Sequence, residues 1–279
     1  MLIPMNVLLT NDDGIHAPGL RALYNRFINT HQVSVVAPDR ERSAIGHAIS
    51  LNQPLRAIRV SPNGEYKGYE VNGTPADCIK LAIAEILSER PNVVIAGINP
   101  GANVGANLNY SGTVAAAKEA ALNGVIGIAV SIEGQVADNY DEAARFVLQL
   151  CDIVTIKGLP FGTFLNVNIP NRPMSEITGV RISRHGTGLL SEYVEKRIDP
   201  RNRTYYWQGP DMQSFEEDPA VDGTELGQNF ISITPIKCDM TDKRVLEDLK
   251  SWRIKKNKIE YLRLKIYWSR SPRRRRYNK

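Results

Sequence analysis

Residues 6–14 read NVLLTNDDG, a short apolar run that ends in four turn-forming residues. Valine and leucine in a continuous run favour a buried strand, and asparagine, aspartate and glycine favour a turn. A helix pattern follows, with Pro18 at its start and apolar side chains at helical spacing: Leu20, Leu23, Tyr24 and Phe27. The opening of the chain therefore predicts a strand, a loop that carries two adjacent aspartates, and a helix.

This alternation of strands and helices continues through the first 150 residues. Further apolar runs predict strands at 33–37, 93–96 and 126–130. Helix patterns begin near residues 75, 112 and 140, and turn residues within 40–70 indicate loop and hairpin structure. Continuously apolar strands that alternate with helices are typical of a parallel sheet covered on both faces. We therefore expect an α/β, Rossmann-like fold with a mostly parallel sheet.

The pattern changes after about residue 180. Residues 181–196 and 203–209 resemble the strands of a polar hairpin, 228–235 a late strand, and 242–252 a short helix. We therefore expect a Rossmann-like catalytic core over 1–180 and a C-terminal hairpin and helix arm, serving oligomerisation, over 181–252. A basic extension occupies 253–279.

The charge of the chain is unevenly distributed. Residues 250–279 contain thirteen Lys or Arg and one acid, Glu260, a net charge of +12. Because the whole chain carries +5, residues 1–249 carry −7. A nucleic-acid interaction would therefore depend on the tail alone, and a solvated tail without a dedicated partner explains the same composition.

Composition also indicates the compartment. No apolar run approaches the roughly 18 residues that span a bilayer, so no membrane partner is expected. The segment Met1–Asn6 lacks the basic and apolar regions of a secretory signal. Three scattered cysteines, Cys78, Cys151 and Cys238, favour reduced thiols over a disulfide framework. We expect a cytoplasmic protein.

Polar side chains follow three of the predicted strands. Asp12 and Asp13 follow the first, Ser43 lies in the loop after the second, and Asn99 follows the third. The carboxyl ends of parallel strands share one edge, where α/β proteins bind ligands. Two carboxylates, a hydroxyl and an amide oxygen suit Mg²⁺ or Mn²⁺ better than zinc. The alternative is that Asn11–Gly14 is simply a turn.

The start of the alanine-rich helix is a second candidate site. Ser111, Gly112 and Thr113 precede it, and a small-residue helix N-terminus offers free N–H groups to a phosphate. Ser111 or Thr113 could instead be an ordinary N-cap, and the two interpretations are compatible. For Thr74 and Asp77, at the start of another helix, we favour a structural capping role.

Taken together, six stretches resemble the SurE family of survival-protein 5′/3′-nucleotidases. They are LLTNDDGIHAPGL (8–20), VVAPDRERSAIGHAIS (35–50), VNGTPADCIKLAI (71–83), VIAGINPGANVG (94–105), YSGTVAAAKEAAL (110–122) and ISITPIKCDMTD (231–242). The resemblance covers roughly residues 5–252, and the basic tail has no typical counterpart in it. It implies a Rossmann-like core and a metal-dependent phosphatase that hydrolyses nucleoside 5′- and 3′-monophosphates, with some members also trimming short polyphosphate.

The resemblance also assigns roles to residues of this chain. Asp12, Asp13, Ser43 and Asn99 would bind one Mg²⁺ or Mn²⁺ per subunit, and the two aspartates would be catalytic. Asn103, Ser111, Gly112 and Thr113 would contact phosphate or substrate. Water activated by the cation would attack the phosphorus, with Asp12 or Asp13 as a possible general base. Family members exchange C-terminal elements, which implies a homodimer or homotetramer.

Two functions of other classes remain open at this point. The chain could bind nucleotides without hydrolysing them, or it could be an RNA-associated protein that acts through its tail. The adjacent carboxylates disfavour both, because their mutual repulsion is costly unless a cation or proton offsets it. The general acid also stays open: His16 and His47 lie in the same loops as the expected ligands, but lone loop histidines are more often surface residues.

Overall fold

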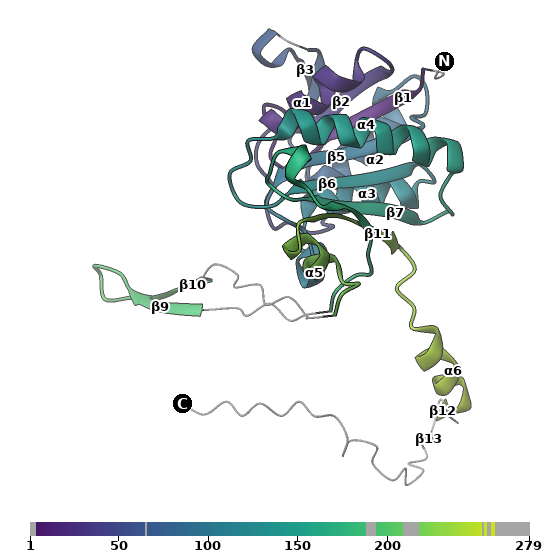
Figure 1. The fold of residues 1–279 in the computed structure, drawn as a ribbon. Helices are drawn as coiled ribbons and strands as arrows, with labels where there is room; N and C mark the ends of the chain where they lie inside the picture. The colour runs from purple at the N-terminus through teal and green to yellow at the C-terminus, as the bar shows by residue number, and fades with distance from the viewer. Residues whose placement is uncertain are drawn as a thin grey trace. The chain divides into compact units, whose positions relative to one another are not determined.

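The computed structural model describes residues 4–64, 66–187, 194–208, 218–252, 254–255 and 258–259. Its centre is a nine-stranded sheet with the strand order β3-β4-β2-β1-β5-β6-β7-β11-β8 (Figure 1). The strands are β1 (Asn6–Thr10), β2 (Gln32–Pro38), β3 (Ala57–Val60), β4 (Gly68–Val71), β5 (Val93–Pro100), β6 (Ile126–Ile132), β7 (Thr163–Ile169), β8 (Gly179–Ile182) and β11 (Phe230–Lys237).

The middle of the sheet is parallel, as the sequence predicts. Each neighbouring pair from β4 to β7 runs parallel. The antiparallel pairs lie toward the two edges, where β3 pairs with β4 and β11 pairs with β7. The last strand, β8, is parallel to β11. The expected α/β fold with a mostly parallel sheet is therefore confirmed.

Helices cover both faces of this sheet (Figure 1). Helices α1 (Pro18–Phe27) and α4 (Tyr140–Lys157) contact each other on one face, and α2 (Pro75–Leu81) and α3 (Gly112–Leu122) on the other. Alternate residues of each central strand enter the two cores: Leu9 packs on the α1 and α4 side, and Leu8 on the α2 and α3 side. Both side chains are fully buried. Burial on both faces explains the continuously apolar strands.

The sequence interpretation differs from the structure at β7, at the end of α4 and in the C-terminal hairpin. It did not identify β7, and it ended α4 seven residues early, at residue 150 instead of 157. It also placed the first hairpin strand at 181–196, whereas the hairpin consists of β9 (Val194–Ile198) and β10 (Thr204–Gln208). Residues 179–182 belong to β8 of the main sheet, because they pair with β11.

Contacts within the chain group residues 1–238 in one compact unit and 239–279 in another. The predicted boundary at residue 180 therefore lies within β8, and the division into core, arm and extension stays a prediction. The first unit also contains α5 (Asp222–Gly227) and a π-helical turn, Ala82–Ile86, that continues α2. Its 3₁₀ turns are Pro62–Gly64, Gly105–Asn109 and Met174–Glu176.

The second unit contains α6 (Lys243–Ser251), capped by Asp242, and the short antiparallel strands β12 (Ile254–Lys255) and β13 (Lys258–Ile259). Residues 260–279, the greater part of the predicted basic extension, lie outside the described residues. Within the described part of the chain, no helix is long and apolar enough to cross a membrane.

Candidate active site

The predicted metal ligands follow neighbouring parallel strands. In the sheet, β1 lies between β2 and β5, with Thr10 paired to Ala96. Asp12 and Asp13 leave β1 beside the end of β5, which carries Asn99. The loop after β2 carries Ser43, and the backbone N–H of Arg42 in that loop donates to the carbonyl of Asp12 over 2.7 Å. The structure therefore brings the three predicted loops to one edge of the sheet.

Asp12 is buried, with 5% of its surface exposed. Burial raises the pKa of its carboxyl above the usual value. Hydrogen bonds from the Thr113 hydroxyl and from the backbone amides of Thr113 and Gly112 lower this pKa, but by less than burial raises it. Because both amides belong to the first turn of α3, the positive end of this helix faces the Asp12 carboxylate.

The surroundings of Asp13 carry more negative charge than those of Asp12. Burial, the charge of Asp12 and the charge of Glu41 together raise the pKa of Asp13 to about 7. Its Oδ2 atom is buried and has no hydrogen-bond partner among the described residues. A buried acceptor without a donor is unusual in a folded protein, and it marks this oxygen as a ligand for a cation or a proton.

Ser43 and Asn99 supply the other two expected ligand oxygens. Ser43 is exposed, and its hydroxyl donates to the Glu41 carboxylate. The Asn99 side chain donates through Nδ2 to the carbonyl of Gly101 over 2.7 Å. This bond engages the nitrogen, so the amide oxygen remains the atom that could ligate a cation. Both residues can thus offer an oxygen atom to a cation, although the Ser43 hydroxyl would first have to break its hydrogen bond with Glu41.

These residues fit a hard divalent cation. The donors are oxygen atoms, two of them carboxylates that repel each other without a cation. Among the described residues, no cluster of three or more His, Cys, Asp or Glu could hold a metal. The sequence did not single out Glu41, although its place two residues before Ser43 was a usable signal.

The predicted phosphate contacts surround the start of α3. Ser111 is the N-cap, because its hydroxyl accepts from the backbone N–H of Val114 over 3.1 Å. The Thr113 hydroxyl and the first amides of the helix bind Asp12, so the anion at this helix start is a side chain of the protein itself. The capping interpretation is confirmed, and phosphate contact by Ser111, Gly112 and Thr113 stays a prediction.

Asn103 is anchored in a buried polar network. Its amide Nδ2 donates to the Ser131 hydroxyl, and its backbone N–H donates to Oδ1 of Asn168, each over 2.8 Å. Its carbonyl accepts from Nδ2 of Asn166 and of Asn168. The sequence analysis missed these partners on β6 and β7. This network of hydrogen bonds holds Asn103, and with it the loop after β5, in place. A substrate contact by Asn103 stays a prediction.

A hollow of about 360 Å³ lies between α1 and the start of α4. Arg21, Asn25, Asp138, Tyr140 and Asp141 are among its lining residues. Burial raises the pKa of Tyr140, and the charges of Asp13 and Asp138 raise it further. Tyr140 therefore lies within electrostatic reach of Asp13, a relation that the sequence did not predict.

Asp222, the first residue of helix α5, clamps the loop after β5, from which it is distant in the sequence. It is fully buried, and its carboxylate accepts from the backbone N–H groups of Gly105, Gly186 and Gly223 over 2.9 to 3.3 Å. His185 adds a contact of 2.8 Å from Nε2 to the Gly105 carbonyl. No local pattern reveals this clamp, because Gly105 and Asp222 lie 117 residues apart.

Asp222→Asn is expected to lower the free energy of unfolding by about 2–3 kcal/mol, because the amide carries no charge and its NH₂ group replaces Oδ2, which accepts from Gly105. Urea unfolding of the purified variant measures this loss. Asp218→Asn is the matched control, because Asp218 pairs with Arg184 at the surface and such pairs contribute at most about 1 kcal/mol. Equal stability of Asp222→Asn and wild type would contradict the clamp.

Comparison with known proteins identifies the family. Residues 7–192 match the family model described as survival protein SurE.

The chain belongs to the SurE family.

The relatives of this SurE chain are similar over nearly its whole length. It is 54% identical to the 5′-nucleotidase SurE of Desulfatibacillum aliphaticivorans, over 90% of this chain and all of the relative. It is 45% identical to the 5′-nucleotidase SurE of Syntrophobacter fumaroxidans, over the same shares. The crystal structure of the SurE protein from Aquifex aeolicus superimposes with a TM-score of 0.77 at 35% identity. This match covers 88% of this chain and 98% of that one.

These matches confirm the family and the fold expected from the sequence. The relatives are named for a hydrolase that acts on phosphoric monoesters, which is the enzyme class predicted for this chain.

Proposed function

We propose that this SurE chain is a divalent-metal-dependent phosphatase that hydrolyses nucleoside 5′- and 3′-monophosphates to nucleoside and phosphate, and also trims short polyphosphate. The names of its relatives support the nucleotidase activity. The observation that carries the metal dependence is the buried Oδ2 of Asp13, next to Asp12, for which the residues that the structure describes supply no hydrogen-bond partner. Two adjacent carboxylates in that setting favour a bound cation.

In this proposal Asp12, Asp13, Ser43 and Asn99 hold one Mg²⁺ or Mn²⁺. The cation would supply activation of water and neutralisation of charge on the phosphoryl group. Asp12 is fixed by Thr113 and the start of α3, so its orientation is set before substrate arrives. Asp13 is the better proton acceptor of the two, because its Oδ2 has no donor among the described residues.

The same helix start would help to bind the phosphate. Ser111, Gly112 and Thr113 form the N-terminus of α3, whose positive end offsets negative charge, and Asn103 would contribute from the loop after β5. In the protein alone, the positive end of α3 faces the Asp12 carboxylate. If a cation neutralised that carboxylate, the positive end of the helix would attract the phosphate of the substrate more strongly. The residues of the chain thus contribute mainly positioning and charge compensation.

We further propose a cytoplasmic homodimer or homotetramer formed by exchange of C-terminal elements. The β9–β10 hairpin supports this assembly, because it exposes apolar side chains that a partner could cover. They include Val194, Ile198, Tyr206 and Trp207, each more than half exposed. Contact of the basic tail with nucleic acid stays a prediction, since residues 260–279 lie outside the described part.

Phosphate release from a panel of 5′- and 3′-nucleoside monophosphates, with Mn²⁺, Mg²⁺ or EDTA, tests the activity. We expect release to depend on the metal and to fall at least about 100-fold in EDTA, because the cation supplies several kcal/mol of transition-state stabilisation. Folded protein that binds nucleotide but releases no phosphate with either metal would refute the proposal. Equal release in EDTA would refute the metal dependence alone.

A further inference from the structure

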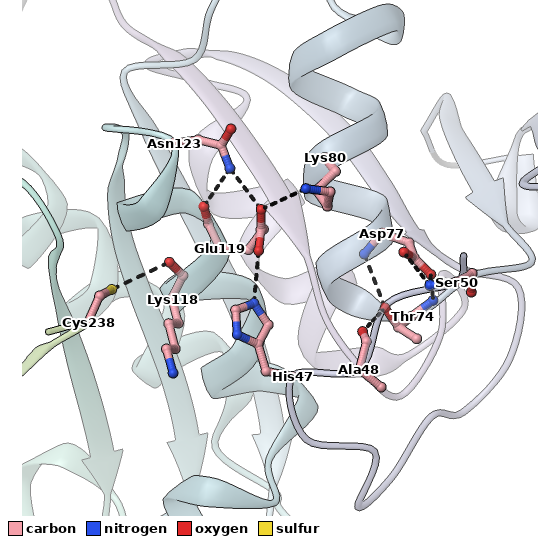
Figure 2. A network of polar contacts seen from close by, with 10 residues as sticks. All are labelled: His47, Ala48, Ser50, Thr74, Asp77, Lys80, Lys118, Glu119, Asn123 and Cys238. Atoms are coloured by element: carbon pink, nitrogen blue, oxygen red, sulfur yellow. Dashed lines mark hydrogen bonds and ion pairs between the residues drawn. The ribbon is translucent and has the colours of Figure 1, made fainter. Parts of the chain in front are cut away.

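The loop that carries Ser43, residues 39–50, is fastened to helices outside the metal site (Figure 2). The carbonyl of Ala48 accepts from the Thr74 hydroxyl over 2.8 Å, and the backbone N–H of Ser50 donates to the Asp77 carboxylate over 3.0 Å. Thr74 and Asp77 form the capping box of α2. We call residues 39–50 the Ser43 loop. Its second half therefore rests on the start of α2.

In the second half of the Ser43 loop, one contact depends on a side chain of the loop itself. Nε2 of His47 lies 2.9 Å from Oε2 of Glu119 on α3, and Figure 2 shows the two groups facing each other. The contacts at Ala48 and Ser50 use only loop backbone, so substitution of loop side chains leaves them in place. The contact at residue 47 is lost when the imidazole is removed.

Glu119 is an unusual residue for its position. Only 6% of its surface is exposed, on a helix whose other buried residues are mostly alanines. Burial raises the pKa of its carboxyl, but the hydrogen bond from His47 and the charge of Lys80 bring the pKa below the usual value. A carboxylate this buried is costly unless it is paired. Its partners are His47 at Oε2, and Asn123 at 2.9 Å and Lys80 at 3.6 Å at Oε1.

Helix α3 thereby connects two of the predicted ligand segments. Near its start Thr113 binds the Asp12 carboxylate, and six residues later Glu119 binds the Ser43 loop. Six helical residues span about 9 Å. At its first half the loop is tied to Asp12, through the N–H of Arg42. Ser43 therefore lies between Arg42, which is tied to Asp12, and two contacts with the α3 segment. In these contacts the N–H of Gly46 donates to the carbonyl of Tyr110 over 2.8 Å, and His47 contacts Glu119.

We propose that His47 and Glu119 form a positioning pair that holds Ser43 at the distance from Asp12 and Asp13 needed to bind the cation. This inference rests on the proposed metal-dependent function. Neither residue touches the reacting atoms in the proposal. The pair acts through the Ser43 loop, as residues behind the ligands of a metal site commonly do.

Three readouts test the pair in the full-length protein. They are hydrogen exchange of amides 43–50 in the metal-free state, calorimetric titration with Mn²⁺, and kcat and KM for a 5′-nucleoside monophosphate. For His47→Ala we expect about tenfold faster exchange and about tenfold weaker Mn²⁺ binding, as for loss of an outer-shell partner. With Mn²⁺ below saturation, kcat should fall about tenfold and KM should change less than about twofold.

Two further variants separate positioning from general stability. His47→Gln keeps an N–H donor for Glu119, and we expect it to restore Mn²⁺ affinity to within about threefold of wild type. Lys80→Met removes the half-exposed partner of the same carboxylate without touching the loop, so all three readouts should stay within about twofold. If His47→Ala does not fold, Glu119→Gln is judged by the same readouts.

The proposal is overturned if His47→Ala lowers the melting temperature but leaves Mn²⁺ affinity and loop exchange unchanged, because the pair is then structural only. It is equally overturned if Lys80→Met weakens Mn²⁺ binding as much as His47→Ala does. Failure of the proposed function is a separate result: wild-type protein would bind Mn²⁺ but release no phosphate. In that case exchange and Mn²⁺ affinity still decide whether His47 positions Ser43.

Discussion

The Asp13→Asn variant is expected to release phosphate from a nucleoside monophosphate at least about 1000-fold more slowly than wild type. The substitution removes one of two carboxylates from the proposed cation site, and with it the buried Oδ2 that has no donor in the described part of the chain. A neutral amide binds a divalent cation more weakly and accepts a proton poorly. Initial rates at saturating Mn²⁺ and substrate measure the loss.

The same substitution should stabilise the metal-free protein, and the effect should depend on pH. The pKa of Asp13 is about 7 in the folded protein, against 3.8 for a free side chain. Between these values the folded state holds a proton that the unfolded state has lost, so wild-type stability falls as pH rises. The difference of about three units corresponds to at most about 4 kcal/mol. The amide side chain of the variant does not titrate in this range, so the variant avoids this loss.

Urea unfolding in EDTA at pH 4 and pH 8 tests this sign. Near pH 4 the variant and wild type should be almost equally stable, and at pH 8 the variant should be more stable. Asp248→Asn, on the exposed helix α6, is the matched control and should change neither activity nor stability. A variant that is less stable than wild type at pH 8, or one that keeps near-normal activity, would count against a cation site at Asp13.

The sequence predicted the features that depend on local pattern. Continuous apolar runs located β1, β2, β5 and β6, because each is buried on both faces of the sheet. Because these strands were expected to be parallel, the sequence was enough to predict that Asp12, Asp13 and Asn99 lie at one edge of the sheet. The cap of α2 by Thr74 was also predictable, since it involves only residues within one turn.

The features that sequence reasoning missed depend on contacts between distant segments. The bonds of Asp222 to Gly105 and Gly186, the partners of Asn103 and the contact of Glu119 with His47 each join residues at least 28 positions apart. The periodic pattern of apolar residues in a sequence does not indicate such pairs. Residues 181 and 182 of β8 were assigned to a polar hairpin strand over 181–196. In the structure β8 is the edge strand of the sheet, and three of its four residues are exposed. Long-range pairing, not local propensity, decided these cases.

Gly112→Ala should reduce phosphate release about 100-fold, although alanine is the better helix former. A Cβ at residue 112 would lie 2.8 Å from Cβ and 2.9 Å from Oδ2 of Asp12. Helix propensity would favour alanine by up to about 1 kcal/mol, whereas forcing buried groups apart costs about 1–3 kcal/mol. The clash therefore dominates, and Asp12 must move from the position in which Thr113 holds it.

Gly227→Ala provides the comparison that isolates this clash. Gly227 is the last residue of α5, and a Cβ there would meet no heavy atom within 4 Å. That variant should match or slightly exceed wild-type stability and keep full activity, because only helix propensity changes. Chemical unfolding and initial rates of both variants give the result. If Gly112→Ala were as active as Gly227→Ala, close approach of α3 to Asp12 would be unnecessary, and the helix start would not be the element that orients this ligand.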